Sequence, residues 1–415
     1  MFRAVLTTLF TGFVLLAPLN AQSFELKPKK IRLSNDTADV FPELELRRLS
    51  SLADSIKQPR YKSTSPQRFS TLFGTGEPLE VAFAGDEQKG AGKGFDSLFA
   101  DIAGEGNLSK GKRLSGKPVR AGSSTEDTTF PPFKVEVPGG DDEIDYSVQA
   151  RLVVSRTSPS DKTPRDSTLY LTSLCCLEGD VELGGKKQRM IVFDANCNGA
   201  FGERGAPNRG SGAPSGDKVW IGSGSPKLEE AYIEALPLGK YTLFEGAYYE
   251  VSVGEDHFAQ IQPAAVPLGK LKVSNPGFLL ELAQGGDVLY VSNDEGTDLD
   301  IPVGEYRMIT PGFRAKYKGA VWELQGNDGS LRESFSIDEG GETAVAVGPP
   351  IKLVVTSTVS NTAAGLIATL KFDMVGSQGE KYKYLRKDGK KVALPEVSIR
   401  DEKGREVKKG RFEYG

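Results

Sequence analysis

The stretch FKVEVPGGDDEIDYSVQARLVVS, residues 133–155, decides the fold class. Apolar and polar side chains alternate from Phe133 to Val137 and again from Ile144 to Leu152. This alternation is typical of β-strands that bury one face. The Gly-Gly-Asp-Asp sequence between the two runs consists of residue types that favour a tight turn. The stretch therefore predicts a β-hairpin.

Similar patterns recur along the chain and predict more hairpins. They are DVELGGKKQRMIVFD (180–194), YYEVSVGEDHFAQI (248–261), DVLYVSNDEGTDLDIPVGEYRM (287–308) and SIRDEKGREVKKGRFEY (398–414). Regularly spaced short strands with polar turns favour β-sandwiches. We therefore expect a mainly β protein made of several β-sandwich-like modules in tandem. A weak internal repeat, PLGKY (237–241), PLGKL (267–271) and PVGEY (302–306), is typical of turns at which strands begin.

The first 21 residues, MFRAVLTTLFTGFVLLAPLNA, have the layout of a secretory signal peptide. One basic residue, Arg3, precedes an apolar run that is short for a membrane-spanning helix of roughly 20 residues. We expect cleavage after Ala21, with no transmembrane segment left. A secreted, periplasmic or cell-envelope location follows.

Changes in composition and the positions of proline and glycine suggest the domain organisation. Pro42 suits a first helical turn, and Leu49, Ala53 and Ile56 would share one helix face. Gly348-Pro-Pro reads as a boundary. The expected units are a signal peptide (1–21), a short N-terminal helix with a linker (22–75), a β-rich module (76–262), a β-sandwich module (263–347) and a C-terminal Ig-like β module (348–415).

The charge and the histidine count exclude several functions. The chain has 52 basic and 56 acidic residues, a net charge of −4, which argues against nucleic acid as a partner. Its single histidine, His257, excludes histidine-rich zinc sites. No Gly-x-Ser-x-Gly nucleophile elbow accompanies that histidine. We expect no catalytic residues.

The segment DANCNGAFGE, residues 194–203, resembles the first half of an EF-hand calcium loop. Such a loop places oxygen ligands at positions 1, 3 and 5, glycine at 6 and a carbonyl at 7. Asp194, Asn196, Asn198 and the Ala200 carbonyl match the four ligand positions.

The second half of the calcium loop departs from this pattern. Position 12, where an EF-hand has a bidentate glutamate, is Gly205. Glu203 or Asp217 could close the coordination shell instead. The alternative is a plain Asx-type turn, in which Asp and Asn side chains hydrogen-bond to their own backbone.

A poorer copy of the loop lies upstream. Asp101, Glu105 and Asn107 take positions 1, 5 and 7, whereas position 3 is Ala103 and provides no ligand. Both loops follow strand-like runs, which suggests a shared origin. Weak Ca²⁺ binding is the only cofactor we expect.

Several of these motifs together resemble a group of uncharacterised exported bacterial proteins with EF-hand-like loops. The motifs are GFDSLFADIAGEGNLS (94–109), MIVFDANCNGAFGE (190–203) with GDKVWIG (216–222), VPLGKL (266–271), IPVGEYRM (301–308) and GRFEYG (410–415). The resemblance implies export, β-rich modules and calcium loops, and implies no known reaction. Ala103 and Glu105 depart from the loops usual in that group, which read Asp-x-Asn-x-Asp-Gly or Asp-x-Asn-x-Asn-Gly.

The three cysteines are Cys175, Cys176 and Cys197. Because an exported chain can be oxidised, we expect one disulfide between Cys197 and either Cys175 or Cys176. Neighbouring residues of a strand point to opposite faces, so only one of the pair can face Cys197. Three buried free thiols are the alternative.

The sequence as a whole favours an exported, non-catalytic structural or binding protein with calcium-stabilised loops. Its ligand is open, and a cell-surface polysaccharide or protein is the kind of partner we expect. The alternative is a secreted, carboxylate-dependent hydrolase acting on polysaccharide, which would require two carboxyl groups across a cleft.

Overall fold

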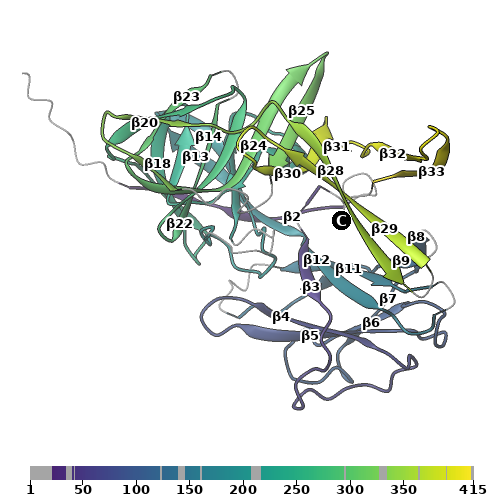
Figure 1. Cartoon of the computed structure of the whole chain (residues 1–415). Coiled ribbons are helices and arrows are strands. Elements are labelled where there is room, and N and C mark those ends of the chain that lie inside the picture. The colour runs from purple at the N-terminus through teal and green to yellow at the C-terminus, as the bar shows by residue number, and fades with distance from the viewer. Residues whose placement is uncertain are drawn as a thin grey trace, which may run out of the picture.

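The structure is a computed structural model. It describes residues 21–33, 40–41, 43–121, 124–138, 145–158, 161–206, 216–293, 296–326, 334–362, 365–388 and 390–412. The expected signal peptide lies outside these residues, apart from Ala21. The described chain is mainly β, as predicted, with several separate sheets and one short helix (Figure 1). No helix in the described ranges is long and apolar enough to cross a membrane.

The stretch that decided the fold class forms the centre of a six-stranded sheet. In β11 (Ser147–Ser155) every second side chain is buried, as the alternation predicted. The predicted hairpin exists, because Phe133 pairs with Val148; its turn lies outside the described residues. The order is β3 (Leu44–Arg47), β12 (Asp166–Ser173), β11, β9 (Thr125–Thr129) and β8 (Val119–Ala121), with β10 (Phe133–Lys134) beside β11.

Three more sheets belong to the same half of the chain. The first is β4 (Gln67–Phe73), β5 (Leu79–Asp86), β6 (Ser97–Ala100) and β7 (Lys112–Ser115). The second is β16 (Leu236–Pro237), β15 (Lys218–Gly222), β14 (Lys186–Phe193), β13 (Cys175–Leu183) and β2 (Lys27–Lys30). The third is β1 (Gln22–Glu25), β19 (Phe258–Pro263), β18 (Ala247–Val253) and β17 (Tyr241–Phe244).

These four sheets share one hydrophobic core, which we call the first core. It runs from Leu26 to Ile261 and takes buried side chains from every one of the four sheets, such as Phe83, Leu152 and Leu177. The 184–185 turn of the predicted β13–β14 hairpin uses two glycines in the left-handed region, with φ of 59° and 73°. Tight hairpin turns require this conformation.

A second core runs from Tyr248 to Tyr382 and lies mainly in the second half of the chain. A three-stranded sheet contains β23 (Asp298–Pro302), β20 (Leu268–Val273) and β27 (Glu342–Val345). A nine-stranded sheet has the order β22 (Asp287–Asn293), β21 (Phe278–Gln284), β24 (Gly304–Tyr317), β25 (Ala320–Gly326), β30 (Lys381–Lys387), β29 (Gly365–Val375) and β28 (Lys352–Thr362). β26 (Ser334–Ile337) pairs with β24, and β31 (Lys390–Lys391) with β30; β32 (Glu396–Arg400) and β33 (Glu406–Arg411) form the predicted last hairpin.

The structure corrects the expected N-terminal helix. Residues 43–58 contain the strand β3 and turns, and no helix. Leu46 is buried on β3, while Leu52 and Ile56 reach a small separate core through turns. Pairing of β3 with β12 overrides the weak helical pattern, because it satisfies the backbone and buries Leu46 together.

The structure also corrects the hairpin expected over residues 287–308. β22 pairs with β21, whereas β23 pairs with β20 in another sheet. The polar turn therefore carries the chain between two sheets. Alternation along two neighbouring runs indicates strands but does not say which strands pair.

The expected boundary at Gly348 does not separate two sheets. β30, from beyond that position, pairs with β25, and Met374 and Tyr382 are buried in the second core. β28, β29, β30 and β31 complete the sheet that contains β21. The 22–75 segment likewise provides β1 to β4 to four different sheets.

The one described helix, α1 (Leu228–Glu234), was not expected. Its Ala231 and Tyr232 are buried, and the Tyr232 ring meets the Phe193 ring edge-on with centroids 5.2 Å apart. The helix covers the face of β14 that points away from the first core. Phe193, which packs against this helix, is the last residue of β14 and directly precedes the calcium-like loop.

Candidate functional site

The calcium-like loop begins at Asp194, immediately after β14, and Asp217 precedes β15. Asp194 is 2% exposed. Its carboxylate accepts backbone N–H groups of Asn198 at 3.2 Å and Gly199 at 2.9 Å, and the Tyr146 hydroxyl at 2.5 Å. The residue at position 1 therefore organises the turn, as it does in calcium loops and also in Asx turns.

Glu203 lies close to the two asparagines of the loop. Its Oε2 accepts Nδ2–H of Asn196 at 2.7 Å and Nδ2–H of Asn198 at 2.5 Å. Oδ1 of Asn198 accepts the Ala200 N–H at 3.0 Å, while no described residue hydrogen-bonds to the buried Oδ1 of Asn196. Positions 3 and 5 of the loop thus converge on one carboxylate.

Asp217 packs against the loop from the other side. It is 0% exposed, and its Oδ2 accepts N–H groups of Gly202 at 2.7 Å and Glu203 at 3.1 Å. Its buried Oδ1 has no hydrogen-bond partner among the described residues. A buried carboxylate oxygen without a partner is costly, and such an atom calls for an explanation such as an ion.

The electrostatics of the three carboxylates agree with this view. Burial, followed by the charges of Asp194 and Glu203, raises the pKa of Asp217 well above its usual value. Burial, opposed by the hydrogen bonds from Tyr146 and the loop, raises the pKa of Asp194 to about 6. The charge of Glu203 makes a smaller contribution to this rise. The protein therefore holds three acids close enough to repel one another.

The oxygen atoms of these side chains suit a hard cation, although the described residues do not form a complete metal site. In the part of the chain that the structure describes, no three side chains among His, Cys, Asp and Glu are grouped as metal ligands. A calcium ion takes oxygen ligands from amides and carbonyls as well. Rotating the amide of Asn196 would place its oxygen beside Glu203 without moving the backbone. The same rotation at Asn198 would break the hydrogen bond from the Ala200 N–H.

The upstream loop is built alike but is internally satisfied. Asp101 is 4% exposed and accepts N–H groups of Glu105 at 3.3 Å and Asn107 at 3.0 Å. Oδ1 of Asn107 accepts the Ser109 hydroxyl at 2.6 Å, and the Glu105 side chain is exposed. These contacts make it a self-capped turn.

The two loops share their anchoring. Gly106 and Gly199 stand at position 6 with φ of 68° and 81°. At position 8, Leu108 is 0% exposed and Phe201 is 9% exposed. The shared plan follows from the need for a left-handed turn and an apolar anchor, so it does not by itself indicate metal.

The expected disulfide is wrong, because all three cysteines are free and buried. Cys175 points into the first core and Cys176 into the core under α1, which confirms that neighbours on the strand face opposite sides. Cys197 shares the first core with Cys175. The Cys175 thiol lies 3.4 Å from the Asp145 carbonyl and the Cys197 sulfur 3.6 Å from the Tyr146 hydroxyl, so each has a polar neighbour of its own.

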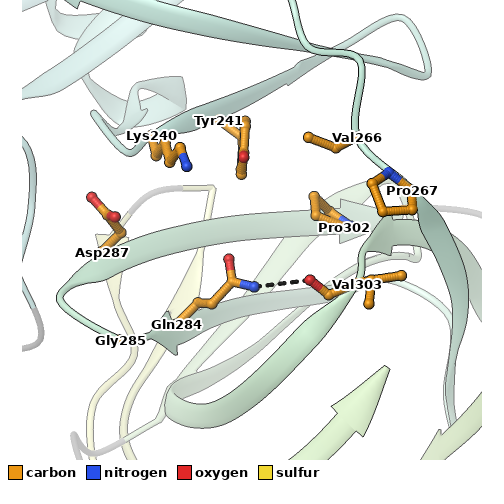
Figure 2. A pocket seen from close by; sticks show the side chains of 9 residues that line it. All are labelled: Lys240, Tyr241, Val266, Pro267, Gln284, Gly285, Asp287, Pro302 and Val303. Carbon is orange, nitrogen blue, oxygen red and sulfur yellow. Dashed lines mark hydrogen bonds between the residues drawn. The ribbon is translucent and has the colours of Figure 1, made fainter. Parts of the chain in front are cut away.

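A cavity of about 360 Å³ lies where the three Pro-x-Gly repeats meet (Figure 2). The first repeat gives Lys240 and Tyr241, the second gives Pro267, and the third gives Pro302 and Val303. Figure 2 shows a polar end with Lys240, Asp287 and the Gln284 amide oxygen, and an apolar end with Val266 and the prolines. The three repeats thus line one site, which the sequence did not predict.

The glycines of these repeats are explained by close approaches. A Cβ at Gly239 would lie 2.1 Å from the Val288 carbonyl oxygen, and one at Gly269 would lie 2.1 Å from that of Asp338. At Gly304 it would lie 2.0 Å from Nε2 of Gln284, which donates to the Val303 carbonyl at 3.0 Å. The repeat is therefore a packing motif at strand ends.

A smaller cavity of about 180 Å³ adjoins the calcium-like loop, and Phe201, Glu203, Glu255 and His257 are among its lining residues. His257 is 7% exposed in the turn between β18 and β19, with φ of 61°, and its N–H donates to the Gly254 carbonyl. The histidine thus shapes a turn, next to the loop in space.

A buried charge network and the contact of Tyr146 with Asp194 were not predicted from the sequence. Glu87 is 0% exposed and accepts N–H groups of Gly92 and Gly94. Arg156 pairs with Glu87 at 3.3 Å and with Glu126 at 3.1 Å. The glycine-rich segment 89–95 therefore wraps around the protein's own carboxylate. The Gly-Lys-Gly sequence at residues 92–94 was a weak indication that backbone N–H groups surround an anionic group. Nothing in the sequence connects Tyr146 to Asp194.

Comparisons with known proteins add little to this picture. No protein-family model matches the chain, and no curated protein sequence matches it. Among solved structures, a leucine-rich repeat protein from Bacteroides thetaiotaomicron VPI-5482 matches with 13% identity and a TM-score of 0.16. That match covers 41% of this chain and 24% of the other, so the chain spans about a quarter of that protein's length. A likeness this low carries no argument.

Proposed function

We propose that this chain is an exported, non-catalytic structural or binding protein whose 194–205 loop is held by Ca²⁺. The observation that carries the proposal is Asp217. Its carboxylate is fully buried, its Oδ1 has no partner in the part of the chain that the structure describes, and the charges of Asp194 and Glu203 oppose its ionisation. A divalent cation would offset all three effects.

The calcium ligands would come from the 194–205 loop and from Asp217, which immediately precedes β15. Asp194, Asn196, Asn198 and the Ala200 carbonyl would provide the loop side, and Asp217 or Glu203 would close the shell. With one to three carboxylates the affinity should be low, about 10⁻⁴–10⁻³ M, as in extracellular calcium modules. This range suits export, which the N-terminal segment and the family resemblance support.

Calcium at this place would stabilise structure. The loop joins β14 to β15, and a Cβ at Gly199 would lie 2.5 Å from Val137, so the loop is packed tightly against its neighbours. Gly202 likewise lies against the backbone of Val253. A bound ion would thus fix three segments of the first core, from β14, β15 and the end of β18.

Calcium titration with matched variants tests the proposal. At about 5 mM calcium, roughly ten times a weak dissociation constant, the gain should be about 1.4 kcal/mol, a rise of about 2–4 °C in melting temperature. Asp217→Asn keeps the volume and removes the charge, so it should abolish this rise and leave the calcium-free protein at least as stable. Asp101→Asn, the equivalent change in the upstream loop, should keep the full rise.

Magnesium and a chelator serve as controls in the same experiment. Mg²⁺ requires near-ideal octahedral geometry and should produce little change. An unmoved wild-type melting curve in calcium, with no heat in calorimetry, would show that the loop is an Asx turn.

The hydrolase alternative has less support. Asp287 is the one carboxylate among the described residues that line the larger cavity. Glu203 and Glu255 both line the smaller cavity, but its volume of about 180 Å³ falls below the range usual for ligand sites, roughly 300–1,000 Å³. Glu203 is also engaged by two asparagine amides. A binding role therefore fits better than hydrolysis.

A further inference from the structure

The strands β28 and β29 form a long two-stranded ribbon that extends beyond the rest of the nine-stranded sheet (Figure 1). The ladder between them runs without a register shift from Lys352–Val375 to Thr362–Gly365. Of β29, only Met374 and Val375 pair with β30. Most of the ribbon therefore consists of two strands alone, and an isolated two-stranded hairpin is only marginally stable in water.

One face of this ribbon is apolar. Leu353, Val355 and Val359 lie on the same face because they are separated by even numbers of residues. Their exposed fractions are 62%, 52% and 63%. Across the ladder, Leu353 faces Met374 and Val355 faces Phe372. The outer strand thus presents to solvent side chains that are normally buried.

The outer edge of the ribbon lacks the usual protection against pairing. Among the described residues no strand lies beyond β28. From residue 353 to residue 362 the sequence LVVTSTVSNT contains no charge, proline or glycine and is rich in valine and threonine. Natural edge strands normally carry lysine, proline or a bulge to prevent pairing with another chain. This strand is built to accept a neighbour.

We propose that β28 pairs antiparallel with β28 of a second copy of this chain, about a two-fold axis through Ser357. That register pairs all eleven residues of the strand. It sets Val355 of each copy opposite Val359 of the other, on the apolar face. It also sets Thr356 opposite Thr358, and threonine and β-branched residues make favourable cross-strand pairs.

Charge favours the antiparallel over the parallel pairing of two copies. The single charge of β28, Lys352, would face the neutral Thr362 of the other chain. A parallel pairing in register would place the two lysines side by side. An antiparallel register shifted by one residue would bring the apolar face of one copy beside the polar face of the other. The four-stranded surface that results exceeds the three strands that confer independent stability.

The contact is small, so the association should be weak and dependent on concentration. Stable dimers bury about 1,200 Å² or more, and one pair of strands buries less. Sedimentation velocity from about 1 µM to about 1 mM of mature wild-type chain should show a monomer–dimer equilibrium. A wild-type protein that is monomeric throughout this range overturns the proposal.

Two double variants test the register and the symmetry. In Val355→Lys/Val359→Lys, two lysines face each other twice across the axis. In Val355→Lys/Val359→Glu, lysine faces glutamate twice, and the same apolar area is lost. Like charges directly opposite repel and unlike charges attract. The Lys/Glu variant should therefore dimerise at least about tenfold more tightly than the Lys/Lys variant.

The comparison does not depend on folding, because both positions are exposed in the single chain. Circular dichroism at about 1 µM, where both variants should be monomeric, should give the same melting temperature for the two variants. Equal dissociation constants for them, or open-ended polymers in place of a dimer, overturn the two-fold pairing. The proposal is independent of the calcium site, which none of these changes touches.

Discussion

At the scale of single residues, Asp194 and Asp217 make the candidate site sensitive to pH. The pKa of Asp194 is raised to about 6 from its ordinary value of 3.8. A raised carboxyl pKa means that the folded state holds the proton more tightly than the unfolded state. Without calcium, this group therefore lowers the free energy of unfolding as pH rises from about 4 to about 6.

Calcium should reverse this dependence, because it binds the ionised carboxylate. The rise in melting temperature caused by about 5 mM calcium should be full at about pH 7.5 and largely lost at about pH 5. Measuring curves with and without calcium at each pH cancels the other titrating groups. Equal calcium shifts at the two pH values would contradict the involvement of Asp194. Asp194→Asn should show no calcium shift at either pH.

At the scale of elements, the loop depends on one glycine. Gly199 has φ of 81°, and an added Cβ would lie 2.5 Å from Val137. Gly199→Ala should destabilise the protein by about 2–5 kcal/mol, through backbone strain of about 1–2 kcal/mol and overpacking. Gly185→Ala is the matched control, since Gly185 has φ of 73° and nothing within 4 Å. It should cost about 1–2 kcal/mol.

Urea denaturation of the two variants would measure this difference. Similar losses would mean that the packing of the loop against Val137 is loose, and that backbone strain alone explains both changes. A larger loss at Gly199 would identify the loop as a rigid part of the first core.

Strands and turns could be predicted from the sequence because they depend on local patterns. The β11 alternation and the Gly184-Gly185 turn are both confirmed. Pairing between distant strands could not be predicted, since a period of two says nothing about partners. The helix expected near Ile56 gave way to such a pairing, and the 287–308 run was divided between two sheets.

The candidate site could be predicted in part for the same reason. Asp194, Asn196 and Asn198 come from one short segment, so their spacing was informative. Asp217 was suggested because it follows the glycine-rich segment, and the structure places it against Gly202 and Glu203. Tyr146 reaches the site from the residue just before β11, which belongs to another sheet, and no local pattern contains that contact.

At the scale of the whole molecule, the two cores meet at the sheet of β1, β19, β18 and β17. Neighbouring residues of β18 face opposite sides: Tyr248 is buried in the second core and Tyr249 in the first. The Tyr248 hydroxyl donates to the Asp300 carbonyl at 3.0 Å and so joins this sheet to β23. The cavity of the Pro-x-Gly repeats contacts the same region through Tyr241.

The continuity of the nine-stranded sheet across Gly348 predicts how the chain responds to truncation. A chain that ends at Val347 loses the β25–β30 pairing and the buried Met374 and Tyr382. Removing two buried large side chains should cost several kcal/mol, enough to unfold the second core. Hydrogen exchange should then show lost protection in β21 and β24, while β11 and β13 keep theirs.

A chain that ends at Leu394 is the matched control for that truncation. It lacks only the β32–β33 hairpin, whose strands are largely exposed and whose neighbour Phe412 stacks on Phe372 with centroids 5.3 Å apart. The cost should be about 1 kcal/mol, mainly from the lost ring contact. If the chain ending at Val347 kept protected amides in β21, the second core would be complete without β30. Residues 348–387 would then fold as a separate unit, against the shared sheet.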